Sequence, residues 1–132
     1  MLTITPFNTL EAAGTAVLTL TEGLEKQEFL ASRLTRAETR RQIHLMSAST
    51  ALLSQQTQDR MAEIDWEGWR ILDQRLGISD KAEDTLLWLA IRALVPDTLM
   101  WLRVYRKNQP EWFRGEAEIH HPTMSPATGA RP

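Results

Sequence analysis

The three histidines are the first candidates for chemistry in this chain of 132 residues, because imidazole exchanges protons near neutral pH. His44 lies between Ile43 and Leu45, and we interpret it as a half-exposed residue at the edge or surface of a helix. His120 and His121 are adjacent, in a segment that supplies no further ligands at the spacing of a metal site. The histidines therefore predict no catalytic residue and no metal site.

Other chemistry is limited by what the sequence lacks. The chain has no cysteine, which excludes disulfides, thiolate zinc sites, iron–sulfur clusters and cysteine nucleophiles. It contains no HExxH, GxSxG, Walker or GxGxxG motif, and its six glycines are too dispersed to hold a phosphate. We expect no cofactor.

The charged residues favour a structural interpretation. Acidic residues cluster where helices are expected to begin, and carboxylates there stabilise exposed amides; they are Glu63, Asp65, Glu67, Glu83 and Asp84. Three arginines share one helical stripe with a fourth beside it, an arrangement that could follow a phosphate backbone. They are Arg33, Arg36, Arg40 and Arg41. The nearby Glu38 and the net charge of −2 favour a solvated face instead, so RNA binding is the weaker alternative.

Nothing at the start of the sequence indicates export, because no basic residue precedes the first apolar stretch. The longest strictly apolar run, residues 86–91, is far shorter than the roughly 18 residues of a membrane-spanning helix. We expect a cytoplasmic protein outside the membrane, a compartment that the absence of cysteine also suits.

Apolar residues recur at steps of three and four through most of the chain, which predicts helices. The predicted helices cover about 9–24, a short turn at 25–32, about 35–60, 65–76, and a last helix that Ser79 or Asp80 caps. Thr35 and Glu38 have capping-box spacing at the start of the long helix, and Asp65 is expected to cap the next one. Pro96 should kink the last helix.

No window alternates with the period of a strand, so the predicted fold class is all-α. We expect an antiparallel bundle of four main helices plus one short helix, formed by a single domain over residues 1–114. Residues 115–132 combine Gly, Pro, Ser and Thr with almost no apolar periodicity, which predicts a flexible C-terminal tail.

The last helix is apolar on nearly all sides, more than one small bundle readily covers. We expect its surplus apolar surface to form the interface of a homodimer. The candidate interface residues are Leu86, Leu87, Trp88 and Trp101.

The order and spacing of these segments resemble the HepT-like group of HEPN helical proteins over roughly residues 9–107. The resemblance rests on Leu10-Glu11-Ala12, Thr21-Glu22-Gly23-Leu24, Glu28-Phe29-Leu30, Leu34-Thr35, Glu63-Ile64-Asp65-Trp66, Leu86-Leu87-Trp88, Arg92 and Pro96. It implies a small all-α dimer. Toxin members of the group are metal-independent ribonucleases paired with a minimal nucleotidyltransferase antitoxin.

The functional motif of that group is degenerate in this chain. The family pattern is Arg-Asn-x-Leu-x-His-x-Tyr, in which Arg and His are thought to act on RNA and the partner adenylylates the Tyr. The segment that corresponds to it is Asp73-Gln74-Arg75-Leu76-Gly77-Ile78-Ser79-Asp80. Only Leu76 matches, while Asp73, Ile78 and Asp80 stand at the Arg, His and Tyr positions.

These observations predict a catalytically silent, HepT-like binding module that forms a homodimer, with a nucleotidyltransferase-type protein as a further partner. The main alternative is an active enzyme. It would be a ribonuclease with a displaced site built on Arg75, Arg92 and His44, or a helical protein that processes nucleotides. An orphan helical interaction module with a chance resemblance is the third hypothesis.

Overall fold

The protein is mostly helical in the part of the chain that its computed structural model describes, residues 6–76 and 81–113. The elements are α1 (Pro6–Thr21), α2 (Lys26–Ala31), α3 (Arg33–Ala51), α4 (Gln55–Arg60), α5 (Trp66–Arg75), α6 (Lys81–Leu89), the π-helical η1 (Ala90–Leu94) and α7 (Val95–Asn108). These residues include no strand, so the all-α prediction is confirmed. The predicted tail, 115–132, lies outside the described residues.

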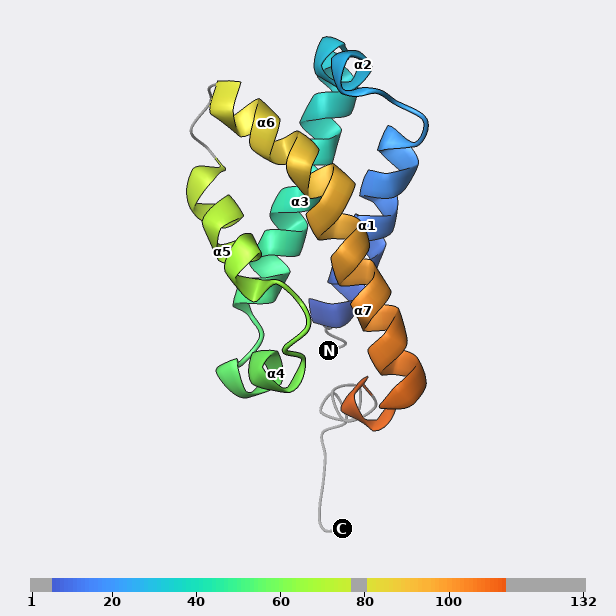
Figure 1. Ribbon diagram of the computed structural model, residues 1–132, viewed down its shortest axis with the longest axis vertical. Helices are drawn as coiled ribbons and strands as arrows, with labels where there is room; N and C mark the ends of the chain where they lie inside the picture. The colour runs from blue at the N-terminus through green and yellow to red at the C-terminus, as the bar shows by residue number, and fades with distance from the viewer. Residues whose placement is uncertain (1–5, 77–80, 114–132) are drawn as a thin grey trace, which may run out of the picture.

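Four long helical elements run up and down the molecule in turn (Figure 1). They are α1, α3, α5 and the continuous run of α6, η1 and α7. The short helices α2 and α4 lie at opposite ends of the bundle and reverse the chain direction. The expected four main helices are therefore present, while the expectation of one short helix is wrong, because residues 6–76 alone contain two, α2 and α4.

The core consists of the apolar stripes of these four elements facing one another. Leu10 and Val17 of α1, Ile43 of α3 and Leu102 of α7 are fully buried. Trp69 of α5 is also fully buried, and its indole Nε1 donates a hydrogen bond to Thr98 Oγ1 at 3.0 Å. The buried polar atom of this large ring is thus satisfied, and the bond joins α5 to α7.

The long helix expected to reach residue 60 ends at Ala51, and α4 is a separate element. Ser54 interrupts the helix by capping α4, since its Oγ accepts a hydrogen bond from Thr57 N at 3.1 Å. Gln58 then donates to the Thr50 and Leu53 carbonyls, which satisfies backbone acceptors at the end of α3. The apolar periodicity continues across this break, which is why it predicted one helix.

The predicted capping box of Thr35 and Glu38 is also wrong. Ser32 caps α3, because its Oγ accepts a hydrogen bond from Thr35 N at 3.3 Å. The Glu38 carboxylate instead accepts bonds from Arg41 and Gln42, which lower the pKa of Glu38 to about 2. Residues three and four positions apart are neighbours on a helix, so the Glu38 carboxylate pairs with these side chains and not with the backbone at the start of α3.

The expected kink at Pro96 takes the form of a π-helical segment. Val95 N donates to the Ala90 carbonyl, five residues earlier, which closes a wide turn immediately before Pro96. Pro96 then lies in the first turn of α7, where a missing backbone N–H costs little. The chain therefore passes from α6 to α7 without a break.

By length and composition, the helical run Ala82–Asn108 could cross a membrane. Its most apolar window has a mean hydropathy of 1.3, and 39% of that window is buried in the bundle. Apolar residues lie on two sides of this run, because Leu87 and Leu102 pack in the core while Leu89 and Met100 are exposed on the surface. The apolar residues on both sides account for its high hydropathy.

Two predictions for the charged residues need correction. Glu83 lies in the first turn of α6, yet its side chain is only 5% exposed and accepts a hydrogen bond from Arg40 of α3. Arg36 donates to the Leu30 carbonyl and lies 4.0 Å from Asp84. Two of the four arginines expected on a solvated face, Arg36 and Arg40, thus hold α3 against α2 and α6, while Arg33 and Arg41 are exposed as expected.

We expect Arg40→Leu to lower the free energy of unfolding by about 2 kcal/mol, because it removes the guanidinium that pairs with the buried Glu83 carboxylate. The value is below that of a fully buried pair because the Arg40 side chain is 41% exposed. Urea denaturation measures the change. Adding Glu83→Gln to Arg40→Leu should recover part of the loss, since it removes the buried charge.

Arg41→Leu is the matched control, because Arg41 and Glu38 form an exposed pair one turn along the same helix. It should change stability little. Equal effects of Arg40→Leu and Arg41→Leu would contradict the structural role assigned to Arg40.

Candidate functional site

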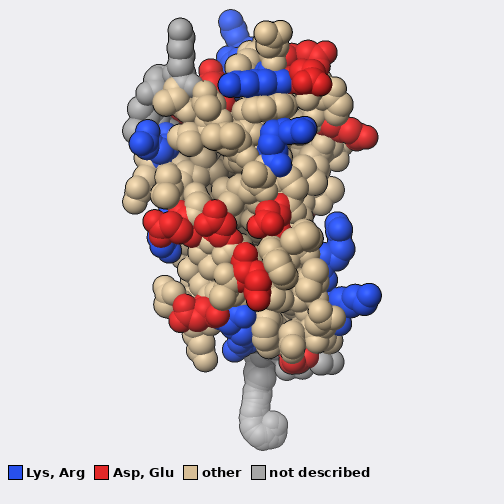
Figure 2. Space-filling model, viewed as in Figure 1, with Lys and Arg blue, Asp and Glu red and all other residues tan. Residues whose placement is uncertain are grey.

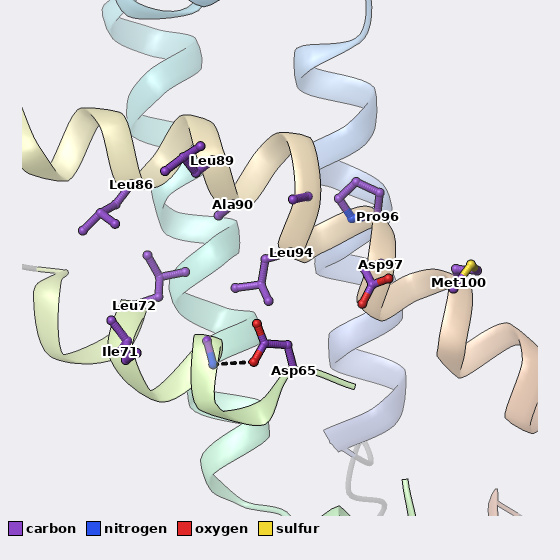
Figure 3. A pocket seen from close by; sticks show the side chains of 12 residues that line it. Asp65, Ile71, Leu72, Leu86, Leu89, Ala90, Leu94, Pro96, Asp97 and Met100 are labelled. Atoms are coloured by element: carbon purple, nitrogen blue, oxygen red, sulfur yellow. Dashed lines mark hydrogen bonds between the residues drawn. The ribbon is translucent and has the colours of Figure 1, made fainter. Parts of the chain in front are cut away.

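An apolar groove of about 830 Å³ lies between α5 and the run of α6, η1 and α7. Its volume is in the range of protein binding sites. Figure 3 shows Leu86 and Leu89 of this run opposite Ile71 and Leu72 of α5, with Leu94 pointing into the space between them. The complete lining is Asp65, Gly68, Ile71, Leu72, Leu86, Leu89, Ala90, Ala93, Leu94, Pro96, Asp97 and Met100.

The rim of the groove exposes large apolar side chains that nothing in the described chain covers. Leu89 is 56% exposed, Ile71 46% and Met100 43%. Leu72 and Ala90 lie deeper and are buried. Apolar side chains gathered around one concave surface are typical of interaction sites.

Acidic side chains occupy one end of the groove. Asp65 caps α5, since its Oδ1 accepts a hydrogen bond from Gly68 N at 2.9 Å, and Asp97 lies exposed in the first turn of α7. A Cβ at Gly68 would lie 2.5 Å from Asp65 Oδ2, so this cap requires glycine there. Figure 2 shows acidic side chains in a band across the middle of the face that carries the groove.

A hydrogen-bonded pair fixes the acidic end of the groove. The buried Tyr105 of α7 donates its phenolic O–H to Glu63 Oε1 and accepts a bond from Glu63 N at 3.3 Å. The bond to Tyr105 lowers the pKa of Glu63, while burial followed by the bond to Glu63 raises the pKa of Tyr105. The pair ties the start of α5 to α7.

The degenerate family motif lies beyond the other end of the groove, at the C-terminus of α5. Asp73, Gln74 and Arg75 are exposed, and Leu76 is half-buried. Asp73 Oδ1 accepts a hydrogen bond from Ser47 Oγ at 2.9 Å, which joins α5 to α3. The positions of Ile78 and Asp80 lie outside the described residues.

Asp73 and Gln74 also line a second, polar cleft of about 350 Å³ between α3, α4 and α5. Its remaining lining consists of Ser47, Thr50, Ala51, Gln55, Gln58, Trp66, Trp69 and Arg70. Arg70 is paired with Glu67, and both tryptophans are buried. No histidine lines this cleft, so its described residues offer no imidazole for proton transfer.

The candidate interface residues lie in different environments. Leu86 lines the groove, whereas Leu87 is 1% exposed and belongs to the core, so its assignment to an interface is wrong. Trp88 and Trp101 are half-buried, with ring centroids 5.6 Å from Phe29 and 6.0 Å from Tyr105. These two tryptophans pack within the protomer, away from the groove.

The sequence analysis missed Ile71, Leu89 and Met100 as groove residues. A usable signal was present on the last helix, where Leu86, Leu89, Ala93 and Met100 follow helical steps along one stripe. The stripe was hidden because apolar residues surround the helix on almost all sides, so periodicity alone does not separate the core face from the exposed face.

The residues of the alternative enzymatic site are not gathered in the groove or in the polar cleft. His44 is exposed on α3, as expected, and the Arg92 guanidinium lies 5.8 Å from the Trp88 ring centroid. His44, Arg92 and Arg75 are all absent from the linings of the apolar groove and the polar cleft. Over residues 6–76 and 81–113, no three His, Asp or Glu side chains group as a metal site.

Comparison with protein-family models, with curated proteins and with solved structures gives no match to this chain. The groove and the chemistry of the residues around it are therefore the features that bear on function.

We expect Tyr105→Phe to reduce stability at neutral pH, because it removes both hydrogen bonds to Glu63 while keeping the aromatic contacts of the ring. Since the folded-state pKa of Glu63 is below its ordinary value of 4.5, the stabilisation is present above pH 4.5 and is lost as the pH falls through the folded-state pKa. Urea denaturation from pH 7 to pH 3 should show the stability difference between the two proteins shrinking below pH 4.5.

Glu63→Gln serves as the control, because its side chain does not titrate. In that background, the effect of Tyr105→Phe should not change with pH. A wild-type difference that stays constant down to pH 3 would contradict the pairing.

Proposed function

We propose that this chain is a catalytically silent helical interaction module that acts as a homodimer through the apolar groove. The observation that carries the proposal is the exposure of Leu89, Ile71 and Met100 around one concave surface. Covering these side chains removes apolar surface from water, and a second copy of the chain is the simplest partner that presents the same surface.

Catalytic silence is proposed from the chemistry of the degenerate motif. Cleavage of an RNA strand needs a group that takes the 2′-hydroxyl proton, a group that protonates the leaving oxygen, and a cation for the developing charge. Asp73 supplies a carboxylate that already accepts a hydrogen bond from Ser47, and Gln74 is neutral. Arg75 is a cation, but it does not line the polar cleft, and no histidine lines that cleft either.

The resemblance to HepT-like HEPN proteins supports the dimer and suggests a second partner. In that group, the partner is a nucleotidyltransferase-type protein in a toxin–antitoxin pair. We propose the same class of partner for this chain, with binding in place of the ribonuclease activity. The alternatives are a ribonuclease with a displaced site, which an RNA-cleavage assay tests, and an orphan interaction module without that partner.

The dimer is expected at micromolar concentration, where light scattering should give twice the chain mass of 15.1 kDa. Leu89→Glu should shift the protein to the monomer, because it places a charge within the apolar surface that the second copy would cover. Leu34→Glu is the matched control, since Leu34 is 83% exposed on α3 and does not line the groove. Circular dichroism would verify that both variants remain helical. A monomeric wild-type protein would contradict the proposal.

The purified protein should leave labelled RNA intact in Mg²⁺, in Mn²⁺ and in EDTA. The three conditions distinguish metal-assisted cleavage by carboxylates from the metal-independent chemistry of the family. Cleavage that is lost in Asp73→Ala would overturn catalytic silence. Cleavage that Asp73→Ala leaves unchanged, but that Arg75→Ala or His44→Ala abolishes, would favour the displaced ribonuclease site.

A further inference from the structure

The two ends of the apolar groove carry charges of opposite sign. Asp65 and Asp97 line one end. Arg75 is the last residue of α5 and lies beyond the other end, one helical turn after Ile71 on the same side of the helix. Neither Asp97 nor Arg75 has an ion-pair partner within residues 6–76 and 81–113. Two exposed and opposite charges are thus separated by the apolar part of the groove.

We infer that a second copy of this chain docks antiparallel on the groove, with Asp97 of each protomer facing Arg75 of the other. The inference rests on the proposed homodimer and adds its geometry. A two-fold axis perpendicular to the groove exchanges its two ends, so each acidic end meets a basic end. A two-fold axis along the groove would place the acidic ends together.

The shape of the lining fits this arrangement. The lining includes small residues, Gly68, Ala90 and Ala93, whose short or absent side chains allow a second protomer to approach the groove closely. Figure 3 shows the larger exposed side chains spread along the groove, with Leu89 and Ile71 far from Asp97 and Met100 close to it. In the antiparallel dimer, Ile71 of one protomer therefore lies against Met100 of the other.

The groove surfaces of two copies therefore match each other, since opposite charges meet at the ends and apolar side chains meet between them. This self-complementarity selects a second copy over an unrelated partner, because a closed two-fold interface needs only one patch that is present on both chains. The charges at the ends set the direction of docking, while the apolar centre supplies the larger part of the affinity.

Charge reversal tests the direction. Asp97→Arg and Arg75→Glu should each raise the dimer dissociation constant about tenfold, because each creates two repulsive pairs across the two-fold axis. The double variant Asp97→Arg/Arg75→Glu should restore dimerisation, since the charges are exchanged and complementary again. Arg33→Glu reverses an exposed charge on α3, outside the groove, and should leave the dissociation constant unchanged.

Failure of the orientation differs from failure of the proposed function. A wild-type monomer would refute both. A dimer that Leu89→Glu disrupts, but that neither charge reversal weakens, would keep the proposed function and overturn the antiparallel docking. A double variant that remains as weak as the single variants would also overturn it.

Cysteine cross-linking gives an independent result, because the chain has no cysteine of its own. Ile71→Cys mixed with Met100→Cys should form a disulfide between the two variants under mild oxidation. Both positions are more than two-fifths exposed, so the substitutions should not disturb the core. A disulfide that forms efficiently within the Ile71→Cys dimer, and not between the two variants, would overturn the antiparallel arrangement.

Discussion

The buried hydrogen bond from Trp69 to Thr98 sets the distance between α5 and α7, and the groove depends on that distance. Both side chains are fully buried, and the Thr98 hydroxyl donates in turn to the Leu94 carbonyl at 2.7 Å. A large ring that must satisfy one N–H in the core has little freedom to move. The two helices are therefore joined in the core of the bundle, while at the surface the groove separates them.

The π-helical segment then determines which residues reach the groove. A π turn contains an additional residue, so it rotates every following side chain relative to a regular α-helix. Ala93, Leu94 and Pro96, within or immediately after this turn, line the groove, whereas Val95 is fully buried in the core. The run of α6, η1 and α7 thus contributes side chains both to the core and to the groove, and η1 determines which of its residues face each.

Polar contacts outside the core hold the remaining elements in place. Arg40 and Glu83 join α3 to α6, Tyr105 and Glu63 join α7 to the segment before α5, and Arg106 forms two hydrogen bonds with Glu11 of α1 at 2.7 and 2.8 Å. These partners are far apart in the sequence. Asp97 and Arg75 differ from them in having no ion-pair partner among the residues described, which is why the proposed antiparallel docking pairs them with each other.

The sequence by itself determined the fold class, most helix positions and the Asp65 cap, because helical periodicity and capping depend on residues within a few positions of one another. It also located the surplus of apolar surface on the last helix. Only the tertiary structure separated Leu87, in the core, from Leu89, on the groove, because the packing of α5 and the π turn decide that division. The Arg40–Glu83 pair was likewise decided by a contact between residues far apart in the sequence. The break before α4 depends on the local cap of Ser54, which the continuous apolar periodicity concealed.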